Sequence, residues 1–283
     1  MKKIVSLIAL SFITQAACAA ENPIVLCYKK ELYRVDADGS NWTQLTNKKV
    51  PGHAPTCKNP SISADGKKII YTYDPEFHGG MSLFSIDMNG KNELRITAKP
   101  RRKDAATWDA SASLNGEYAA FAANRNGNWE IYTVKADGSQ LRNITSSASN
   151  QDSPAWSPDG SKLLFIEDKT SVIYVMNADG SKQTPVTKAD TLAAVPAWSP
   201  DGKKIAFVNR LSGENELWTM NPDGSHQRKV TDGLSKWSTI SWSKDSQQLT
   251  FVDTAEYLTL VNIDGSDKKK VINKKGVYEP SWY

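Results

Sequence analysis

Short runs of β-branched and aromatic residues alternate with turn-forming clusters over most of the chain. In one stretch the runs cover Val195 to Ser199, Lys203 to Asn209, Glu216 to Asn221 and His226 to Thr231. Each run has the length and composition of a β-strand, and the segments between them contain Pro, Gly, Asn and Asp, which favour tight turns. No helical periodicity lies between them. The pattern predicts a unit of four antiparallel strands.

The four-strand unit is repeated along the chain. The segment that starts at Ser157 reads SPDGSKLLF, and the segment that starts at Ser199 reads SPDGKKIAF. Both follow a Pro-Ala-Trp triplet, and weaker copies lie around Ser61, Trp108 and Trp242. A second marker, an Asp-Gly or Asn-Gly pair, ends at Gly39, Gly90, Gly138, Gly180, Gly224 and Gly265. Six units of four strands predict an all-β fold, a six-bladed β-propeller.

The two ends of the repeat region complete one another. Ile24 to Tyr28 align with the second strand of a repeat, whereas Glu279 to Tyr283 align with the first strand. Pairing these segments would complete one blade and remove two open strand edges. We therefore expect the N- and C-terminal strands to close the ring.

The N-terminal segment from Met1 to Ala20 has a different composition from the repeats. Two lysines precede an apolar run from Ile4 to Ile13, and small residues follow up to Ala20. This order is that of a cleaved secretory signal, so we expect a signal peptide at residues 1–20, a propeller at residues 21–283 and export to the periplasm. Cys18 raises the alternative of a lipoprotein, although Gln15 stands where a lipobox carries Leu.

The remaining chain is close to neutral. Without the two lysines of the signal it carries 33 basic and 31 acidic residues, which gives no electrostatic footprint for nucleic acid. No other apolar run approaches the roughly 18 residues of a transmembrane helix. We therefore expect a soluble monomer with no nucleic-acid partner and no transmembrane segment.

Two cysteines remain after removal of the signal. Cys27 lies near the C-terminal end of a predicted second strand, and Cys57 lies in the adjoining crossing between blades, so that both thiols are expected on one face of the ring. Because export exposes both thiols to an oxidising compartment, we expect a disulfide between them.

The repeat resembles that of TolB-type propellers. Its phrase is Pro-x-Trp-Ser-Pro-Asp-Gly-x-x-Ile/Leu-x-Phe, followed further along the repeat by Asp-Gly-Ser and then by an aliphatic-Thr pair. The pairs are Leu45-Thr46, Ile96-Thr97, Ile144-Thr145, Val186-Thr187 and Val230-Thr231. The resemblance covers about residues 22 to 283, and the N-terminal α/β domain of the TolB family has no counterpart here.

The resemblance implies that the propeller binds an envelope protein or peptide, such as a peptidoglycan-associated lipoprotein. The same repeat is also found in propellers fused to peptidases and in oligogalacturonide lyases. The fold alone therefore does not give the function.

Propeller topology separates two kinds of loop. If the first strand of each blade runs down the channel, the Ser-Pro-Asp-Gly and Asp-Gly-Ser turns share the bottom face, and the longer, more variable loops share the top. Variable loops on a rigid scaffold are where binding residues gather. We expect a partner to bind the top face through His53, Phe77, His78, Arg101, Arg102, Asp104, Arg125, Trp129, Asp152, Arg210, Trp237 and Tyr278.

The repeat tryptophans give a reference for the channel. Because they recur at one strand position, we expect them to wedge between blades: Trp108, Trp156, Trp198, Trp242 and Trp282. Counting back four residues from each, or from Ile62 in the repeat that lacks one, gives positions expected at the channel mouth: Lys58, Asp104, Asp152, Ala194, Ser238 and Tyr278.

The sequence contains no complete catalytic or metal-binding motif. A Gly-x-Ser-x-Gly elbow, a His-Glu-x-x-His pair and a phosphate loop are all absent. Asp36 to Ser40 resemble the start of a calcium loop, but the twelfth position is Asn47 instead of the required Glu. We therefore expect a non-catalytic binding protein that needs no cofactor.

Two alternatives stay open. A calcium ion could be held in the channel by Asp104 and Asp152. A carbohydrate-active or hydrolytic enzyme could use top-face carboxylates together with Arg125 or Arg210.

Overall fold

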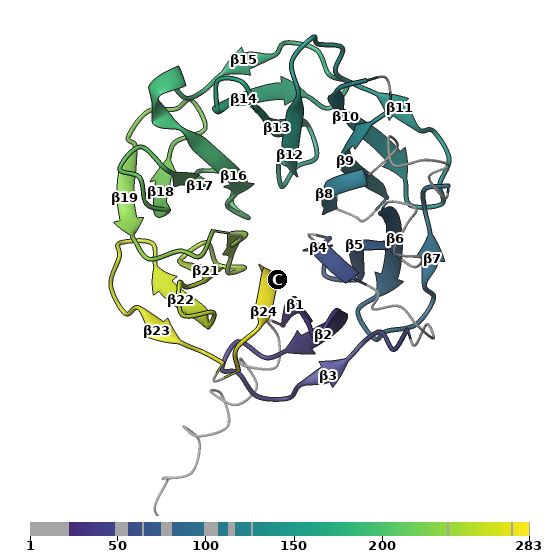
Figure 1. Cartoon of the computed structure of the whole chain (residues 1–283), viewed down its shortest axis with the longest axis vertical. Helices are drawn as coiled ribbons and strands as arrows, with labels where there is room; N and C mark the ends of the chain where they lie inside the picture. Colours follow the sequence, from purple (N-terminus) through teal and green to yellow (C-terminus); the bar gives the residue numbers. More distant parts are fainter. Residues whose placement is uncertain are drawn as a thin grey trace, which may run out of the picture.

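The computed structural model describes residues 23–48, 56–63, 65–74, 81–98, 107–112, 117–125, 127–236, 238–272 and 274–282. These residues form strands β1 to β24 and one short 3₁₀-helix, η2. The strands make six four-stranded antiparallel sheets, which stand as blades around a central channel (Figure 1). The expected six-bladed propeller is confirmed. Among the described residues, no helix is long and apolar enough to cross a bilayer.

Each blade is named by its order along the chain. Blade 1 contains β24 (Val277–Trp282), β1 (Ile24–Tyr28), β2 (Glu31–Val35) and β3 (Thr43–Gln44). Blade 2 contains β4 (Thr56–Ile62), β5 (Lys68–Asp74), β6 (Ser82–Asp87) and β7 (Leu94–Arg95). Blade 3 contains β8 (Thr107–Ala112), β9 (Tyr118–Asn124), β10 (Trp129–Lys135) and β11 (Arg142–Asn143).

The second half of the chain supplies the other three blades. Blade 4 contains β12 (Gln151–Trp156), β13 (Lys162–Glu167), β14 (Val172–Asn177) and β15 (Thr184–Pro185). After η2 (Ala189–Thr191), blade 5 contains β16 (Ala193–Trp198), β17 (Ile205–Asn209), β18 (Glu216–Met220) and β19 (Arg228–Thr231). Blade 6 contains β20 (Ser241–Trp242), β21 (Gln248–Val252), β22 (Leu258–Asn262) and β23 (Lys269–Lys270).

The ring is closed by its own ends, as expected. The last strand, β24, pairs with β1, so that Trp282 lies opposite Ile24 and Val277 lies opposite Tyr28. Figure 1 shows the first and last strands side by side. Trp282 also belongs to a buried cluster that joins blade 1 to Leu258 and Leu260 of blade 6. The seam is therefore both hydrogen-bonded and packed.

The hydrophobic core lies between neighbouring blades. The second strand of a blade is buried along almost its whole length, as in β17, where all five residues are buried. Both faces of such a strand pack against neighbouring sheets, which explains why it reads as a continuous apolar run instead of an alternating one. Trp242 and Trp282 are buried in this core, and Trp156 and Trp198 are half-buried against it. These four tryptophans wedge between blades as expected.

The first repeat tryptophan was placed wrongly. In β8, Ala112 pairs with Ala119 and Trp108 pairs with Ala122. In blade 4 the corresponding register sets Trp156 opposite Leu163 and Asp152 opposite Ile166. Ala112 thus holds the repeat-tryptophan position, and Trp108 holds the channel-mouth position assigned to Asp104. The distance to the turn between the first and second strands explains this difference in register. The turn glycine comes four residues after Trp156 but eight residues after Trp108.

The bottom turns satisfy their own polar groups. In blade 4 the Ser157 hydroxyl donates to the Asp159 carboxylate at 2.6 Å, and the Ser161 amide donates to the same oxygen at 3.0 Å. These bonds hold the pKa of Asp159 below its usual value. The same Ser-to-Asp bond recurs from Ser63, Ser199 and Ser243. The Ser-Pro-Asp-Gly signature therefore encodes a self-contained turn.

The Asp-Gly-Ser turn and the aliphatic-Thr pair meet between blades. A Cβ atom added to Gly180 of blade 4 would lie 2.0 Å from the Ile144 carbonyl oxygen of blade 3, and Gly224 stands in the same relation to Val186. The threonine of each pair acts within its own blade, since the Thr145 hydroxyl accepts the Ile131 amide at 2.9 Å. The Asp-Gly-Ser turn and the aliphatic-Thr pair therefore recur together because the turn of one blade packs against the pair of the preceding blade.

A disulfide joins blade 1 to blade 2. It connects Cys27 in β1 with Cys57 in β4, whose Cα atoms are 5.9 Å apart, as the sequence led us to expect. Both residues are buried beside Tyr71 and Tyr73. Closing a loop of 30 residues stabilises the fold by about 3–4 kcal/mol in the chain-entropy model.

Candidate binding site at the top of the channel

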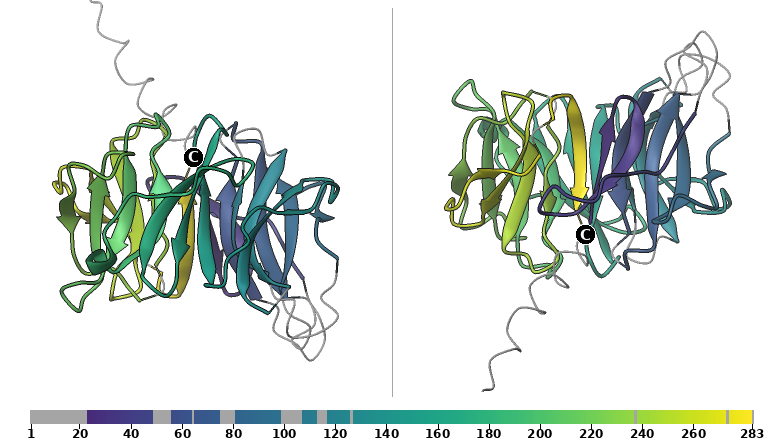
Figure 2. Two further views of the ribbon diagram at one scale, coloured as in Figure 1. Left: turned by 90° about the horizontal axis from the view of Figure 1, so that it is seen from above. Right: turned by 90° about the horizontal axis from the view of Figure 1, so that it is seen from below.

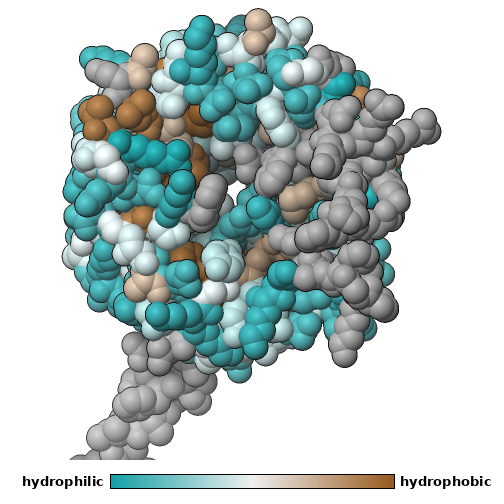
Figure 3. All heavy atoms as spheres, viewed as in Figure 1, coloured by the Kyte–Doolittle hydropathy of each residue, from teal (hydrophilic) through white to brown (hydrophobic). Residues whose placement is uncertain are grey.

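The two faces of the ring differ as the topology predicts. Backbone bonds tie the Asp-Gly-Ser turns to the Ser-Pro-Asp-Gly turns, for example from the Ala178 amide to the Ser161 carbonyl oxygen at 2.9 Å. The opposite, top face carries the loops between second and third strands and the crossings between blades. It faces the viewer in Figures 1 and 3, and Figure 2 shows both faces from the side.

A funnel of about 920 Å³ opens on the top face, mostly over blades 4 to 6, and reaches Asn59 of blade 2 and Glu279 of blade 1. The loop after β17 contributes Arg210 and Glu214, the crossing from blade 5 to blade 6 contributes Lys236 and Ser238, and β12 contributes Asp152. Figure 3 shows the hollow at the centre of this face. Residues from several blades therefore converge on one recess.

The described lining of the funnel is predominantly acidic. Four carboxylate side chains line it: Asp152, Asp168, Glu214 and Glu279. Only two cationic side chains, Arg210 and Lys236, accompany them in this part of the structure. The Arg210 side chain is held by a bond from its Nε to the Asn215 oxygen at 3.1 Å. A recess with this charge balance suits a ligand that carries positive charge.

Two exposed leucines stand beside the funnel. Leu192 is 42% exposed and Leu211 is 62% exposed, and the Arg210 amide donates to the Leu192 carbonyl oxygen at 3.3 Å. Leu192 adopts the left-handed conformation at φ 47°, which is uncommon for a leucine. Large apolar side chains held at the surface of a rigid scaffold are typical of interaction sites.

A bulge near the start of the first strand turns one residue toward the channel. The register shifts between Asp152 and Ala155 in β12, and Ser153 within the bulge has φ 51°. Asn59 and Glu279 occupy the same position in blades 2 and 1. The Asn59 amide donates to the Glu279 carboxylate at 2.5 Å, which joins the two blades. The repeat spacing points to the residue four positions before the tryptophan, whereas the bulge also presents the residue three positions before it, so the sequence pattern does not reveal Asn59 and Glu279.

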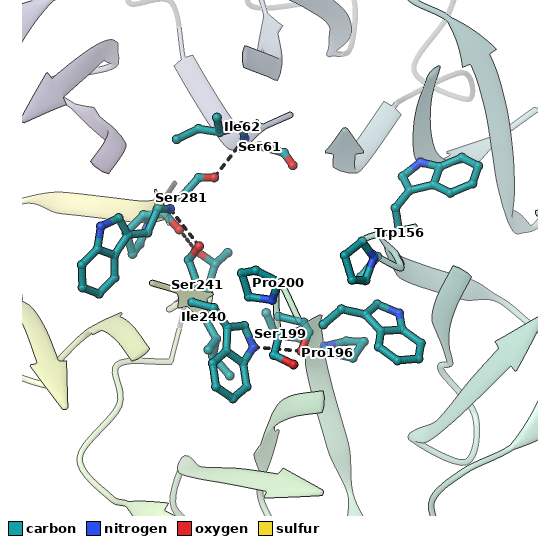
Figure 4. Close-up of a pocket in the computed structure, with 18 of the residues that line it drawn as sticks. Ser61, Ile62, Trp156, Pro196, Ser199, Pro200, Ile240, Ser241 and Ser281 are labelled. Carbon is teal, nitrogen blue, oxygen red and sulfur yellow. Dashed lines mark hydrogen bonds between the residues drawn. The ribbon is translucent and has the colours of Figure 1, made fainter. Parts of the chain in front are cut away.

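The funnel leads into a narrower and more apolar channel. This lower cavity, of about 540 Å³, shares Asn59, Ser153, Val195 and Thr239 with the funnel. Pro60, Pro154, Pro196 and Pro280 line it together with repeat tryptophans. The strands around it are bonded to one another, as the Ile62 amide donates to the Ser281 hydroxyl at 3.0 Å (Figure 4). This rigid wall positions the funnel above it.

The structure brings some of the predicted binding residues together and separates others. Asp152 and Arg210 line the funnel. Arg125 lies instead over the Tyr132 ring of blade 3, 5.4 Å from its centre, and Trp129 is half-buried against the core between blades 3 and 4. Tyr278 is 44% exposed but does not line the funnel, whereas its neighbour Glu279 does. His53, Phe77, His78, Arg101, Arg102, Asp104 and Trp237 lie outside the described residues.

The described part of the chain offers no metal centre. No three His, Cys, Asp or Glu side chains within it are grouped so that they could hold an ion. The calcium alternative depends on Asp104, which lies outside this part.

Comparison with known proteins identifies the family. The model of the TolB β-propeller domain matches residues 11–283. The chain belongs to the TolB β-propeller family. A TolB homolog from Chlorobium luteolum is 30% identical over 137 residues, which are 48% of this chain and 28% of the homolog. The matched segment thus spans under a third of that TolB relative.

Solved structures show the same fold. TolB from Acinetobacter baumannii has a TM-score of 0.78 at 22% identity and covers 92% of this chain, with 66% of that protein covered in turn. An oligogalacturonate lyase in complex with manganese has a TM-score of 0.62 at 15% identity, covering 89% of this chain and 78% of the lyase. At these identities the likeness to TolB and to the lyase concerns the fold alone.

Proposed function

We propose that this TolB-family propeller is a non-catalytic binding protein of the periplasm. It holds a protein or peptide of the cell envelope on its top face. The observation that carries this proposal is the funnel, where charged side chains from three blades and the exposed Leu192 and Leu211 surround one open recess. A polar recess flanked by apolar side chains combines the two parts of a typical protein interface.

The bottom face is a poorer candidate. Its turns bond to themselves, as Ser157 and Ser161 both donate to Asp159. A partner would have to break these bonds to use the same groups, and each lost bond would reduce the gain from binding. The funnel side chains instead surround an open space of about 920 Å³, which a segment of a partner can enter.

The charges of the funnel indicate which kind of partner segment it would bind. Four carboxylates against two cations favour a segment that inserts a lysine or arginine side chain. The leucines would then contact apolar residues beside it. A peptidoglycan-associated lipoprotein is the first candidate, because the family relationship supports it, and the propeller would act as a monomer.

Charge reversal in the funnel tests this assignment. Glu214 is exposed, so Glu214→Lys should leave the melting temperature unchanged but weaken partner binding about tenfold or more, since a favourable charge becomes a repulsive one. The partner is first captured by cross-linking from an envelope extract, and its affinity is then measured by calorimetry.

A matched control variant shows whether the loss of binding is specific to the funnel. Glu117→Lys makes the same charge change at an exposed residue between β8 and β9, on the bottom face, and should leave the affinity within twofold of the unmodified protein. Equal losses for both variants would contradict the site. Cleavage of oligogalacturonide by the purified protein would instead favour the enzyme alternative.

A further inference from the structure

A group of lysines runs from the outer strand of blade 6 to the top-face loops at its junction with blade 1. From Asp267 to Gly276 the sequence holds five lysines and one acidic residue, although the whole chain has 35 basic against 31 acidic residues. Two further lysines lie in the turn between β1 and β2. We name these seven exposed residues the lysine band: Lys29, Lys30, Lys268, Lys269, Lys270, Lys274 and Lys275. In Figure 1, β23 lies on the perimeter of the ring, far from the channel.

Aromatic rings support the band across the seam. The Lys270 ammonium lies 4.0 Å from the centre of the Tyr257 ring, and the Lys275 ammonium lies 5.9 Å from the same ring. Lys274 lies 4.0 Å from the Trp42 ring of blade 1. These cation–π contacts hold the ammonium groups over the ring faces, while the three lysines remain exposed to solvent. The lysines therefore form one surface that spans two blades.

Few carboxylates oppose this charge. Lys269 pairs with Asp267 at 3.4 Å, and Glu256 is exposed in the loop before β22. Asp253, in the same loop, accepts the backbone amides of Ala255 and Tyr257 at 3.0 and 2.9 Å. The Lys268 ammonium donates to the Asp232 carbonyl oxygen at 2.8 Å and is not neutralised by it. The lysines of the band outnumber the carboxylates beside them.

We propose that the lysine band docks the outer rim of the propeller, at blades 6 and 1, onto an anionic phospholipid surface. The two cavities described above, the funnel and the lower channel, have no residue of the band in their lining. Lysine ammonium groups are compact point charges without a fixed bidentate geometry, which suits a diffuse layer of lipid phosphates.

The binding is electrostatic and does not involve insertion. The exposed leucines of the described structure lie on blades 2 to 5, away from the band: Leu94, Leu141, Leu192 and Leu211. Attraction between exposed charges is screened over about 10 Å at 0.1 M salt, so high salt should release the protein. None of the band lysines lines the funnel, and β23 lies on the perimeter of the ring. This proposal is independent of the proposed function.

Vesicle co-sedimentation with the mature protein tests the proposal. We expect binding to vesicles in which phosphatidylglycerol is mixed with an excess of phosphatidylcholine, none to pure phosphatidylcholine, and release at high NaCl concentration. The triple variant Lys270→Gln, Lys274→Gln, Lys275→Gln should bind about a hundredfold more weakly, because each lysine near an anionic surface contributes roughly a fivefold factor. The control variant Lys182→Gln, Lys188→Gln, Lys203→Gln removes three exposed lysines from blades 4 and 5 and should bind normally.

Five results would overturn the proposal. They are equal binding to zwitterionic vesicles, unchanged binding of the band variant at matched melting temperature, and equal weakening of the control variant. The fourth is release by competitors: millimolar inorganic phosphate would indicate a site for one phosphate, and polyglutamate at equal charge would indicate an acidic protein partner. Salt-insensitive binding of the unmodified chain would contradict the electrostatic mechanism even if the band variant fails to fold.

Discussion

Deletion of Glu279 to Tyr283 should abolish stable folding of the ring. The deletion removes most of β24, including Trp282, which lies opposite Ile24 and packs in the cluster between blades 6 and 1. Removing a buried aromatic side chain alone costs about 3–5 kcal/mol, against a total stability of about 5–15 kcal/mol for a typical domain. The deletion also exposes the edge of β1, which can then pair with other chains.

The lost strand also bonds to blades on both sides. The Trp282 amide donates to the Ser241 hydroxyl of blade 6 at 2.8 Å, and the Ile62 amide of blade 2 donates to the Ser281 hydroxyl at 3.0 Å. Circular dichroism melting and size-exclusion chromatography would measure the effect, with aggregation or a lost transition expected. A monomeric truncated protein that melts within a few degrees of the full chain would show that closure does not depend on β24.

Substitution of Gly180 by Ala should destabilise the protein by about 2–5 kcal/mol. Gly180 has φ 89°, which costs an alanine about 1–2 kcal/mol, and the new Cβ would also overlap the Ile144 carbonyl oxygen of the neighbouring blade. Because that carbonyl is backbone, the blades must separate locally to admit the methyl group. Urea unfolding would measure the change in the free energy of unfolding.

Gly213 provides the matched control for this substitution. It has the same φ of 89°, but nothing lies within 4 Å of its added Cβ. Gly213→Ala should therefore cost only the backbone term, about 1–2 kcal/mol. If the two variants lose equal stability, the close approach between blades contributes nothing and the explanation of the Asp-Gly-Ser marker is wrong.

The repeat made the fold predictable because its markers perform local tasks. Ser157 and Asp159 close a turn within a few residues, and Gly180 must be a glycine for two separate reasons. The disulfide was also predictable, since the topology set Cys27 and Cys57 on adjoining elements at one face. Such features depend on short-range chemistry or on the order of strands, both of which a sequence displays.

The candidate site was only partly predictable. The position of Trp108 was misread because a tryptophan was weighed more heavily than its spacing to the next turn, and the register of β8 depends on that turn. Glu279 and Asn59 could not be predicted because the bulge with positive φ is a backbone feature, and the residues that occupy it in different blades share no side-chain type. Trp129 was expected at the interface, but its ring packs between blades, where burial of an aromatic side chain gains more than exposure.

Hydrogen–deuterium exchange of the mature protein, with and without its captured envelope partner, tests the central claim most directly. The top-face account predicts that the amides of residues 209–215 and 232–236 exchange at least tenfold more slowly in the complex. The bottom turns at residues 158–161 and 200–203 should exchange at unchanged rates. Protection confined to these bottom turns, with the funnel loops unaffected, would contradict the claim that this propeller binds its partner through the top of the channel.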